Sequence, residues 1–330
     1  MGTNSLWKMQ SATRVDLSGG TLDCWPLYLL DGDCVTINLA ISISTHAKLC
    51  ARDDKRIDVN IRDLRYAKSF KDLQEFLNCR DNDLRLVQKH VAFWQPEQGF
   101  SLETFSESPV GGGLGGSSSL SISIIKAFSA WCDKKLDVYE AVNLAHNVEA
   151  QVLSKMTGTQ DYFPALVPGL NAIHYTPEGA RLEGLKSTAD FWDGHLSLVY
   201  TGQPHQSGLN NWQVIKASLD GDKGTLRALG DIRRVSWDVY AAIKDGAWEQ
   251  LPGLFDREFE ARVRLSSSFS SPEIDRLRQV ALKSGAQAVK ICGAGGGGCV
   301  MVWSHPERKQ KVEAGCRDQG FEVLGVKAAL

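Results

Sequence analysis

The sequence has 330 residues, of which 43% are apolar and 23% are charged, and its formal net charge is −2 at neutral pH. This length can form one large domain or two ordinary ones, and the composition is that of a globular protein. Because the charges nearly balance, the chain has no electrostatic footprint for nucleic acid or an anionic membrane, and we expect neither as a partner.

The first ten residues are polar and lack the apolar core of a secretion signal. No segment approaches the roughly 18 apolar residues that a membrane span requires. None of the eight cysteines forms a C-x-x-C pair or a cluster with zinc-site spacing. We therefore expect a cytoplasmic protein whose cysteines are free thiols.

In the first half of the chain, alternating β-branched and small residues at 35–49 predict one or two strands, and 100–105 predicts a weaker one. Apolar residues spaced for one face predict a helix from 117 to about 132. A second helix is expected over 137–156. Its first residues resemble a capping box, and Gly158 is expected to end it.

In the second half, residues 195–201 are typical of a strand, and helices are expected at 220–244 and 272–284. Residues 288–292 lead into a second glycine cluster, and a short apolar strand is expected after it at 299–303.

Strands and helices mix without regular alternation, which favours an α+β fold. A glycine cluster in each half of the chain favours two lobes that share a cleft. The polar stretch Thr176–Asp193 is the expected boundary between the lobes, which divides the chain into 1–185 and 186–330.

The first glycine cluster, Pro109–Ser119, has the composition of a polyphosphate-binding loop. Glycines can adopt positive φ and put no Cβ in the way of an anion, and a helix that starts at Ser117 adds free N–H groups. A Walker A loop would need lysine where Ser117 stands. A flexible linker and a dinucleotide-binding loop remain as alternatives at this point, although a long helix follows where the latter would need a second strand.

The segment 109–119 (PVGGGLGGSSS) resembles the phosphate loop of the GHMP kinases, P-x-G-x-G-L-G-S-S-[AS]-[AS], with Gly116 in place of the first serine. The resemblance implies that ten residues bind the phosphates of ATP: Pro109, Gly111, Gly112, Gly113, Leu114, Gly115, Gly116, Ser117, Ser118 and Ser119. It also implies that the hydroxyl of Ser117 reaches a magnesium ion.

Two carboxylates follow the loop. Glu149 interrupts an apolar helical stripe, where a charge is costly unless it is paired, binds a cation or reaches water at an edge. By resemblance to the family, Glu149 would bind magnesium together with Ser117. The segment 158–162 (GTQDY) by itself indicates only a turn. It resembles the G-K-Q-D-Q segment of heptose-phosphate kinases and fucokinases, which implies that Asp161 is the catalytic base, although Thr159 and Tyr162 depart from that pattern.

The segment 14–23 (RVDLSGGTLD) resembles the first motif of fucokinase-like members, R-[IV]-D-L-A-G-G-W-x-D. The resemblance implies that Arg14 lies near the transferring phosphate and Asp161, and that Asp23 binds sugar hydroxyls. Galactokinases have an acid where Gly20 stands, which argues against galactose.

Residues 290–298 (KICGAGGGG) resemble the third motif of the family, which supports the active site from the other lobe. Together the two motifs imply four glycines as further substrate-binding residues: Gly19, Gly20, Gly295 and Gly296. A Y-T-G segment at 200–202 resembles heptose-phosphate kinases but lacks their following arginine, with His205 nearby.

The resemblance covers nearly the whole chain and implies an ATP-binding domain of the ribosomal protein S5 domain 2-like kind, followed by a ferredoxin-like domain. The implied activity is direct phosphoryl transfer from ATP and Mg²⁺ to a hydroxyl, with the anomeric hydroxyl of a sugar or sugar phosphate such as a heptose 7-phosphate as acceptor. Two alternatives remain: a mevalonate-type kinase and a catalytically silent sugar-binding protein. We expect a monomer or homodimer.

Overall fold

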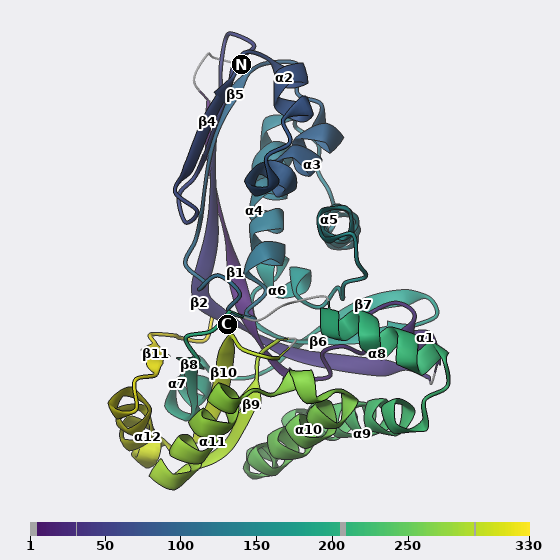
Figure 1. The fold of residues 1–330 in the computed structure, drawn as a ribbon, viewed down its shortest axis with the longest axis vertical. Helices are drawn as coiled ribbons and strands as arrows, with labels where there is room; N and C mark the ends of the chain where they lie inside the picture. The colour runs from purple at the N-terminus through teal and green to yellow at the C-terminus, as the bar shows by residue number, and fades with distance from the viewer. Residues whose placement is uncertain (1–4, 31, 205–208, 294) are drawn as a thin grey trace.

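The computed structural model describes residues 5–30, 32–204, 209–293 and 295–330. A tall lobe made from the first half of the chain stands on a broader lobe made from the second half (Figure 1).

The first lobe is built on a seven-stranded sheet in the order β4-β3-β5-β2-β6-β7, with β1 paired to β2. Its strands are β1 (Leu6–Ser18), β2 (Cys34–Ala51), β3 (Ile57–Ile61), β4 (Tyr66–Phe70), β5 (Phe100–Ser106), β6 (Leu170–Thr176) and β7 (Gly179–Leu185). Strand β2 has 18 residues and serves two neighbours in succession: β6 pairs with its first third and β5 with its last third.

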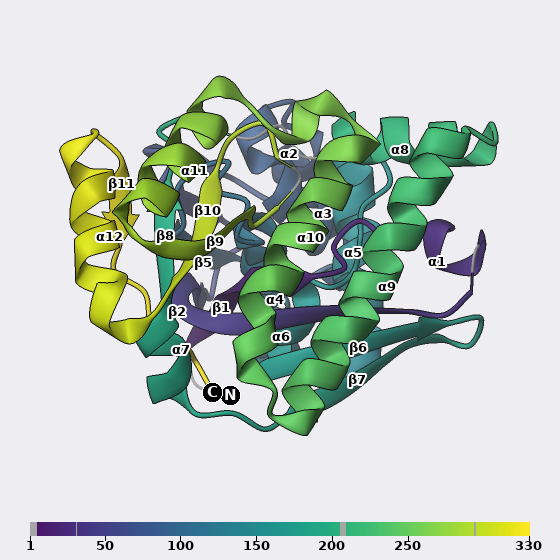
Figure 2. The same cartoon turned by 90° about the horizontal axis from the view of Figure 1, so that it is seen from below.

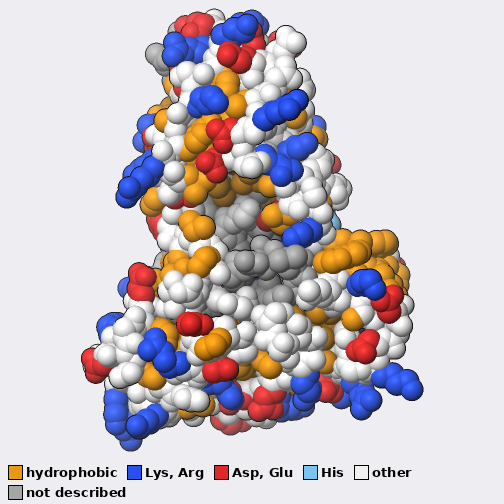
Figure 3. Space-filling model, in the orientation of Figure 1, with side chains coloured by type: hydrophobic (Ala, Val, Ile, Leu, Met, Phe, Trp, Pro, Cys, Tyr) orange, Lys and Arg blue, Asp and Glu red, His pale blue; other side chains and the backbone are white. Residues whose placement is uncertain are grey.

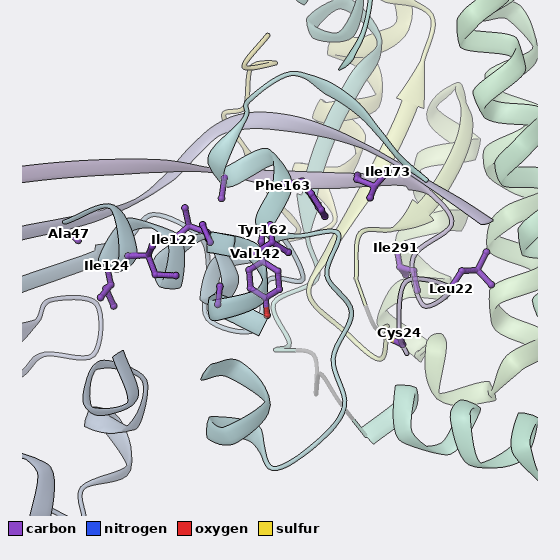
Figure 4. Close-up of a cluster of buried hydrophobic side chains, with 14 of the residues drawn as sticks. Leu22, Cys24, Ala47, Ile122, Ile124, Val142, Tyr162, Phe163, Ile173 and Ile291 are labelled. Carbon is purple, nitrogen blue, oxygen red and sulfur yellow. The ribbon is translucent and has the colours of Figure 1, made fainter. Parts of the chain in front are cut away.

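Helices cover the inner face of this sheet (Figure 1). They are α2 (Leu73–Asn78), α3 (Arg85–Trp94), α4 (Gly116–Trp131), α5 (Val138–Leu153) and α6 (Tyr162–Leu166). The short helix α1 (Leu27–Leu30) lies apart from them and contacts β6. Helix α4 packs against β1 and β2. Four of its serines are buried along with its apolar residues, and two of these, Ser119 and Ser123, hydrogen-bond to Thr45 of β2. Figure 4 shows part of the hydrophobic core between the sheet and these helices, with Tyr162 inside it.

The second lobe has a four-stranded antiparallel sheet in the order β11-β8-β10-β9. Its strands are β8 (Leu196–Tyr200), β9 (Ala286–Ile291), β10 (Cys299–Ser304) and β11 (Glu322–Leu324). Helices precede β9 and connect β10 to β11, so the chain follows a βαββαβ path, and the strand order confirms the ferredoxin-like expectation.

The helices of the second lobe are α7 (Ala189–His195), α8 (Leu209–Leu219), α9 (Lys223–Asp245), α10 (Leu251–Leu265), α11 (Pro272–Ser284) and α12 (Pro306–Asp318). Short 3₁₀ turns occur at Asn82–Leu84, Trp248–Gln250 and Ser267–Phe269. Helices α9 and α10 lie side by side (Figure 2), and both contact β1 of the first lobe. One hydrophobic cluster therefore includes Val15 and Val35 from the first lobe and Phe255 and Trp303 from the second.

Most of the predicted elements are confirmed, and the range 35–49 lies within one strand. The helix expected over 137–156 has the predicted capping box at Asp137 and Glu140. Its predicted end at Gly158 is wrong, because Ser154 adopts a left-handed φ of 53° and the helix stops at Leu153.

The polar stretch 176–193 is not an open linker, because it contains β7 and the start of α7. The chain passes from the first sheet to the second between Leu185 and Leu196. The boundary between 185 and 186 stays a prediction.

No helix in the described part of the chain combines the length and the apolar character that crossing a membrane requires. On the face in Figure 3, positive and negative side chains are interspersed without a block of one sign, as the nearly balanced net charge indicates.

Candidate active site

A cavity of about 380 Å³ lies where the first glycine loop, the end of β1, the segment before α6 and helix α10 meet. This volume is in the range of small-molecule sites. The predicted residues that line it are Arg14, Gly20, Asp23, Pro109, Gly111, Gly112, Gly113, Gly115, Gly116, Ser117, Ser118, Glu149 and Asp161. Their roles stay predictions.

Five predicted residues do not line the cavity. Leu114 is fully buried in the core, and the hydroxyl of Ser119 donates to the carbonyl of Ser11 at 3.0 Å. A Cβ on Gly19 or Gly295 would lie 2.4 Å from a backbone carbonyl, and one on Gly296 would lie 3.2 Å from the carbonyl of Ser268. These positions shape the backbone around the cavity. His205 lies outside the described residues.

The first glycine loop turns three times through the left-handed region, at Gly111, Gly113 and Gly115. Gly115 is the N-cap of α4, and no side chain caps the first turn of that helix. Because Gly116, Ser117 and Ser118 line the cavity, the positive end of α4 opens onto it. Such a helix start is suited to binding an anion.

The second glycine cluster packs backbone to backbone against the first. The N–H of Cys299 donates to the carbonyl of Gly112 at 2.7 Å. A Cβ on Gly293 would lie 2.9 Å from the Cα of Gly113, closer than side chains approach backbone atoms. The second lobe therefore supports the loop directly.

Arg14, on β1, connects three parts of the site. Its Nε and Nη2 both lie 2.7 Å from Oδ1 of Asp161. Its Nη1 donates to the carbonyls of Gly113 at 2.6 Å and of Cys292 at 2.7 Å. Although burial lowers the pKa of this guanidinium, the adjacent charge of Asp161 raises it above its ordinary value overall. Arg14 therefore stays charged and holds Asp161 in place.

Asp161 lies immediately before α6, and a Cβ on Gly115 would be 3.1 Å from its carboxylate. The carboxylate therefore lies next to the turn that begins α4, where the glycine loop ends. A side chain at 115 would crowd this carboxylate, and the left-handed φ of 71° at this position also favours glycine.

Glu149, on α5, is 8% exposed, and its carboxylate reaches the same cavity. Burial raises the pKa of Glu149, while the hydroxyls of Tyr162, Ser118 and Ser117 hydrogen-bond to it and oppose that rise. The Ser118 bond, to Oε2, measures 3.0 Å, and Tyr162 donates to the same oxygen.

This donor set fits a magnesium ion. Among the described residues no three His, Cys, Asp or Glu side chains form a metal cluster. Magnesium bound with a nucleotide needs few protein ligands, because phosphate and water oxygens fill its other positions. One carboxylate, Glu149, beside the exposed hydroxyl of Ser117 meets that requirement.

Asp23 lines the same cavity as Asp161 and is 4% exposed. Its oxygens accept the N–H groups of Thr21 at 3.1 Å and of Gln160 at 3.0 Å. Burial raises the pKa of Asp23 to about 6, with the charges of Asp161 and Asp16 adding to the rise.

Near Asp23 lies a buried ionic cluster that was not predicted from the sequence. Arg262 of α10 pairs with Asp16 of β1 at 3.1 Å and with Glu258 one helical turn away. Lys290 of β9 lies 3.8 Å from Asp16 and 3.5 Å from Glu258. Asp16 and Arg262 line the cavity. The available signal was the i,i+4 spacing of Glu258 and Arg262, but α10 itself was not predicted.

Two family models match the chain. The model "GHMP kinases N terminal domain" matches residues 82–169, and "GHMP kinases C terminal" matches residues 223–321. Together they cover more than half of the 330 residues. The first glycine loop lies within the first matched range and the second glycine cluster within the second.

Among characterised relatives, D-glycero-alpha-D-manno-heptose 7-phosphate kinase of Campylobacter jejuni is 27% identical over 326 residues, 95% of this chain and 94% of that protein. Two solved structures share the fold. A D-glycero-D-manno-heptose 1-phosphate kinase from Bacteroides thetaiotaomicron has a TM-score of 0.79 at 21% identity, covering 98% of this chain and 96% of the other. The mevalonate kinase of Methanococcus jannaschii has a TM-score of 0.77 at 21% identity, covering 99% of both chains.

The motifs, the two-lobed α+β fold and the family models agree with one another. The chain therefore belongs to the GHMP kinase family of phosphotransferases.

Proposed function

We propose that this protein transfers the γ-phosphoryl group of ATP directly to a hydroxyl of a sugar or sugar phosphate. The observation that carries the proposal is the position of Asp161. Its carboxylate lies against Gly115 at the start of α4, where the outer end of a bound polyphosphate would reach. A carboxylate at that point can orient an incoming hydroxyl and accept its proton.

In this proposal, the N–H groups of the glycine loop and of the first turn of α4 bind the phosphates. Glu149 and Ser117 hold the magnesium ion, which neutralises phosphate charge when it is bound. Arg14 keeps Asp161 oriented through two guanidinium nitrogens and borders the position of the transferring group.

The acceptor is expected to lie beside Asp23, whose carboxylate can accept hydrogen bonds from sugar hydroxyls. Its attacking hydroxyl would lie at Asp161. We infer an acceptor of the heptose type, phosphorylated at the anomeric hydroxyl, from the likeness to the Campylobacter enzyme and from the motifs at 14–23 and 158–162. Because ATP is the phosphoryl donor, we propose that the reaction takes place in the cytoplasm.

A mevalonate-type kinase is the second candidate, because archaeal mevalonate kinases also match this chain in sequence and in fold. The residues before Asp161 favour a sugar kinase over this second candidate. Mevalonate kinases usually have T-P-S-G-x-D there, whereas this chain has GTQD at 158–161.

The test is ADP release by the purified protein with ATP and Mg²⁺, across heptose 7-phosphates, unphosphorylated heptose, L-fucose and mevalonate. We expect turnover with one sugar, and a fall of about 10²- to 10⁴-fold in kcat for Asp161→Asn with nucleotide affinity kept. Preferred turnover of mevalonate would support the second candidate. Sugar binding with no ATP turnover would support a silent sugar-binding protein.

A further inference from the structure

Tyr162 is a fully buried tyrosine whose hydroxyl donates to Oε2 of Glu149. Its ring lies in the hydrophobic core of the first lobe, as Figure 4 shows. The segment that this part of the chain resembles, G-K-Q-D-Q, has glutamine at this position. The proposed mechanism gives Tyr162 no role, although it directly follows Asp161.

We propose that Tyr162 is a positioning residue that fixes the carboxylate of Glu149, so that its other oxygen is directed, beside Ser117, to the cation of the bound nucleotide. This inference rests on the proposed function, because it requires a magnesium–nucleotide complex in the cavity.

The hydrogen bonds of Glu149 carry the first step. Ser118 of α4, at 3.0 Å, and Tyr162 of α6 both donate to Oε2 of the same carboxylate. Two donors from different helices fix the plane of the carboxylate and occupy one of its oxygens. The proposal assigns the other oxygen to the cation, in the cavity that Glu149 lines together with Ser117.

The rigidity of Tyr162 carries the second step. The side chain is 0% exposed, and the ring of His146 on α5 stands edge-on at 6.4 Å. A buried ring cannot follow a moving carboxylate, so the hydroxyl acts as a fixed point. A side chain that hydrogen-bonds to a metal ligand, without contacting the metal itself, orients the ligand and strengthens metal binding.

The position of Tyr162 in the chain carries the third step. Asp161 and Tyr162 are consecutive residues at the start of α6. The same short turn therefore places the proposed base on one side and supports the proposed magnesium ligand on the other. Any displacement of the turn would move both.

The test compares Tyr162→Phe, which removes only the hydroxyl, with the matched control Tyr175→Phe. Tyr175 is equally buried, and its hydroxyl accepts from Thr159 without touching Glu149. The full chain is titrated with Mn²⁺ in the presence of a non-hydrolysable ATP analogue, with bound Mn²⁺ measured by electron paramagnetic resonance. The affinity for the analogue alone is measured in EDTA.

We expect Tyr162→Phe to weaken Mn²⁺ binding about 10- to 100-fold, with the metal-free affinity for the analogue unchanged. The dependence of kcat on magnesium should shift in the same direction, and saturating Mg²⁺ should restore much of the rate. Ser118→Ala, which removes the other donor to Oε2, should also weaken Mn²⁺ binding, and it serves as the second variant if Tyr162→Phe does not fold.

Mn²⁺ affinity that matches the control overturns the inference, as does an equal loss of metal-free nucleotide affinity. A failure of the proposed function is distinguishable, because it would appear in the unaltered protein as an absence of metal-dependent nucleotide binding.

Discussion

Asp23 is a carboxylate held where burial opposes its charge. Two backbone N–H groups stabilise the ionised form, yet desolvation and the nearby charges of Asp161 and Asp16 outweigh them and raise its pKa to about 6. The folded protein therefore binds the proton of Asp23 more tightly than the unfolded chain does. The contribution of this group to stability is present at low pH and is lost as the pH rises from about 4 to about 6.

The same pKa predicts how acceptor binding depends on pH. Protonated Asp23 loses its negative charge and carries an O–H donor, so it accepts hydrogen bonds more weakly, and acceptor affinity should fall as the pH drops below about 6. We expect a loss of about tenfold between pH 7 and pH 5, measured by calorimetric titration with the acceptor.

Asp23→Asn is the control for this pH dependence. It should bind the acceptor weakly, and any remaining pH dependence belongs to the acceptor or to other groups. Unchanged affinity of the unaltered protein between pH 7 and pH 5 would show that Asp23 does not receive the acceptor.

At the scale of elements, the two glycine loops depend on each other, because the second presses its backbone onto the first. Gly293 does not have a left-handed φ, so its backbone conformation would tolerate alanine. The added Cβ would instead be too close to the backbone of Gly113. Its Cβ would push Gly113, whose carbonyl also accepts from Arg14 at 2.6 Å.

We therefore expect Gly293→Ala to weaken ATP binding and to lower kcat by about 100-fold, because a shift of about 1 Å in the loop disturbs both phosphate binding and Asp161. The measurement is steady-state kinetics with nucleotide titration.

Gly253→Ala, on α10 with nothing within 4 Å of the added Cβ, is the matched control and should retain full activity. Normal kinetics in Gly293→Ala would mean that the first loop keeps its geometry without close support.

Elements with regular patterns, such as β2, α4 and α5, could be predicted from the sequence, and strand β1, which carries Arg14, could not. The range 35–49 alternates plainly and forms β2. Strand β1 was missed because its inner half buries polar side chains, including Arg14, Asp16 and Ser18, which a hydrophobic pattern does not mark. These side chains are buried because they belong to the site and to the ionic cluster.

The helix face predicted after the glycine loop is buried, but the prediction was incomplete for a related reason. The stripe expected on the helix after the glycine loop is not its only buried face, since Ser119, Ser121 and Ser123 are also buried. The hydroxyls of Ser119 and Ser123 bond to the strands beneath, so these polar residues pack as core.

For the whole molecule, the site depends on contacts that no local pattern contains. Arg14 bonds to Asp161 across 147 positions and to Cys292 across 278. Family motifs could indicate which residues belong to the site, because their order is preserved along the chain. Tyr162 and Arg262 were not indicated, since one departs from its motif and the other lies outside every motif.

The buried ionic cluster brings four charged side chains from the two lobes together. Asp16 comes from β1, Glu258 and Arg262 from α10, and Lys290 from β9; all four side chains are at most 2% exposed. Two positive and two negative charges balance. Oδ1 of Asp16 and Oε2 of Glu258 have no hydrogen-bond partner, and Lys290 is the cation that stands 3.8 and 3.5 Å from them.

Removing Lys290 should therefore leave an uncompensated negative charge in a place that water does not reach. We expect Lys290→Met to lower the free energy of unfolding by about 3 to 5 kcal/mol, measured by urea denaturation. The double variant Lys290→Met with Glu258→Gln restores the balance, because Asp16 and Arg262 still pair. It should lose less stability than the sum of its single variants. Strictly additive losses would show that the four charges do not act as one unit and that the lobes are joined mainly by the hydrophobic contacts of α9 and α10 with β1.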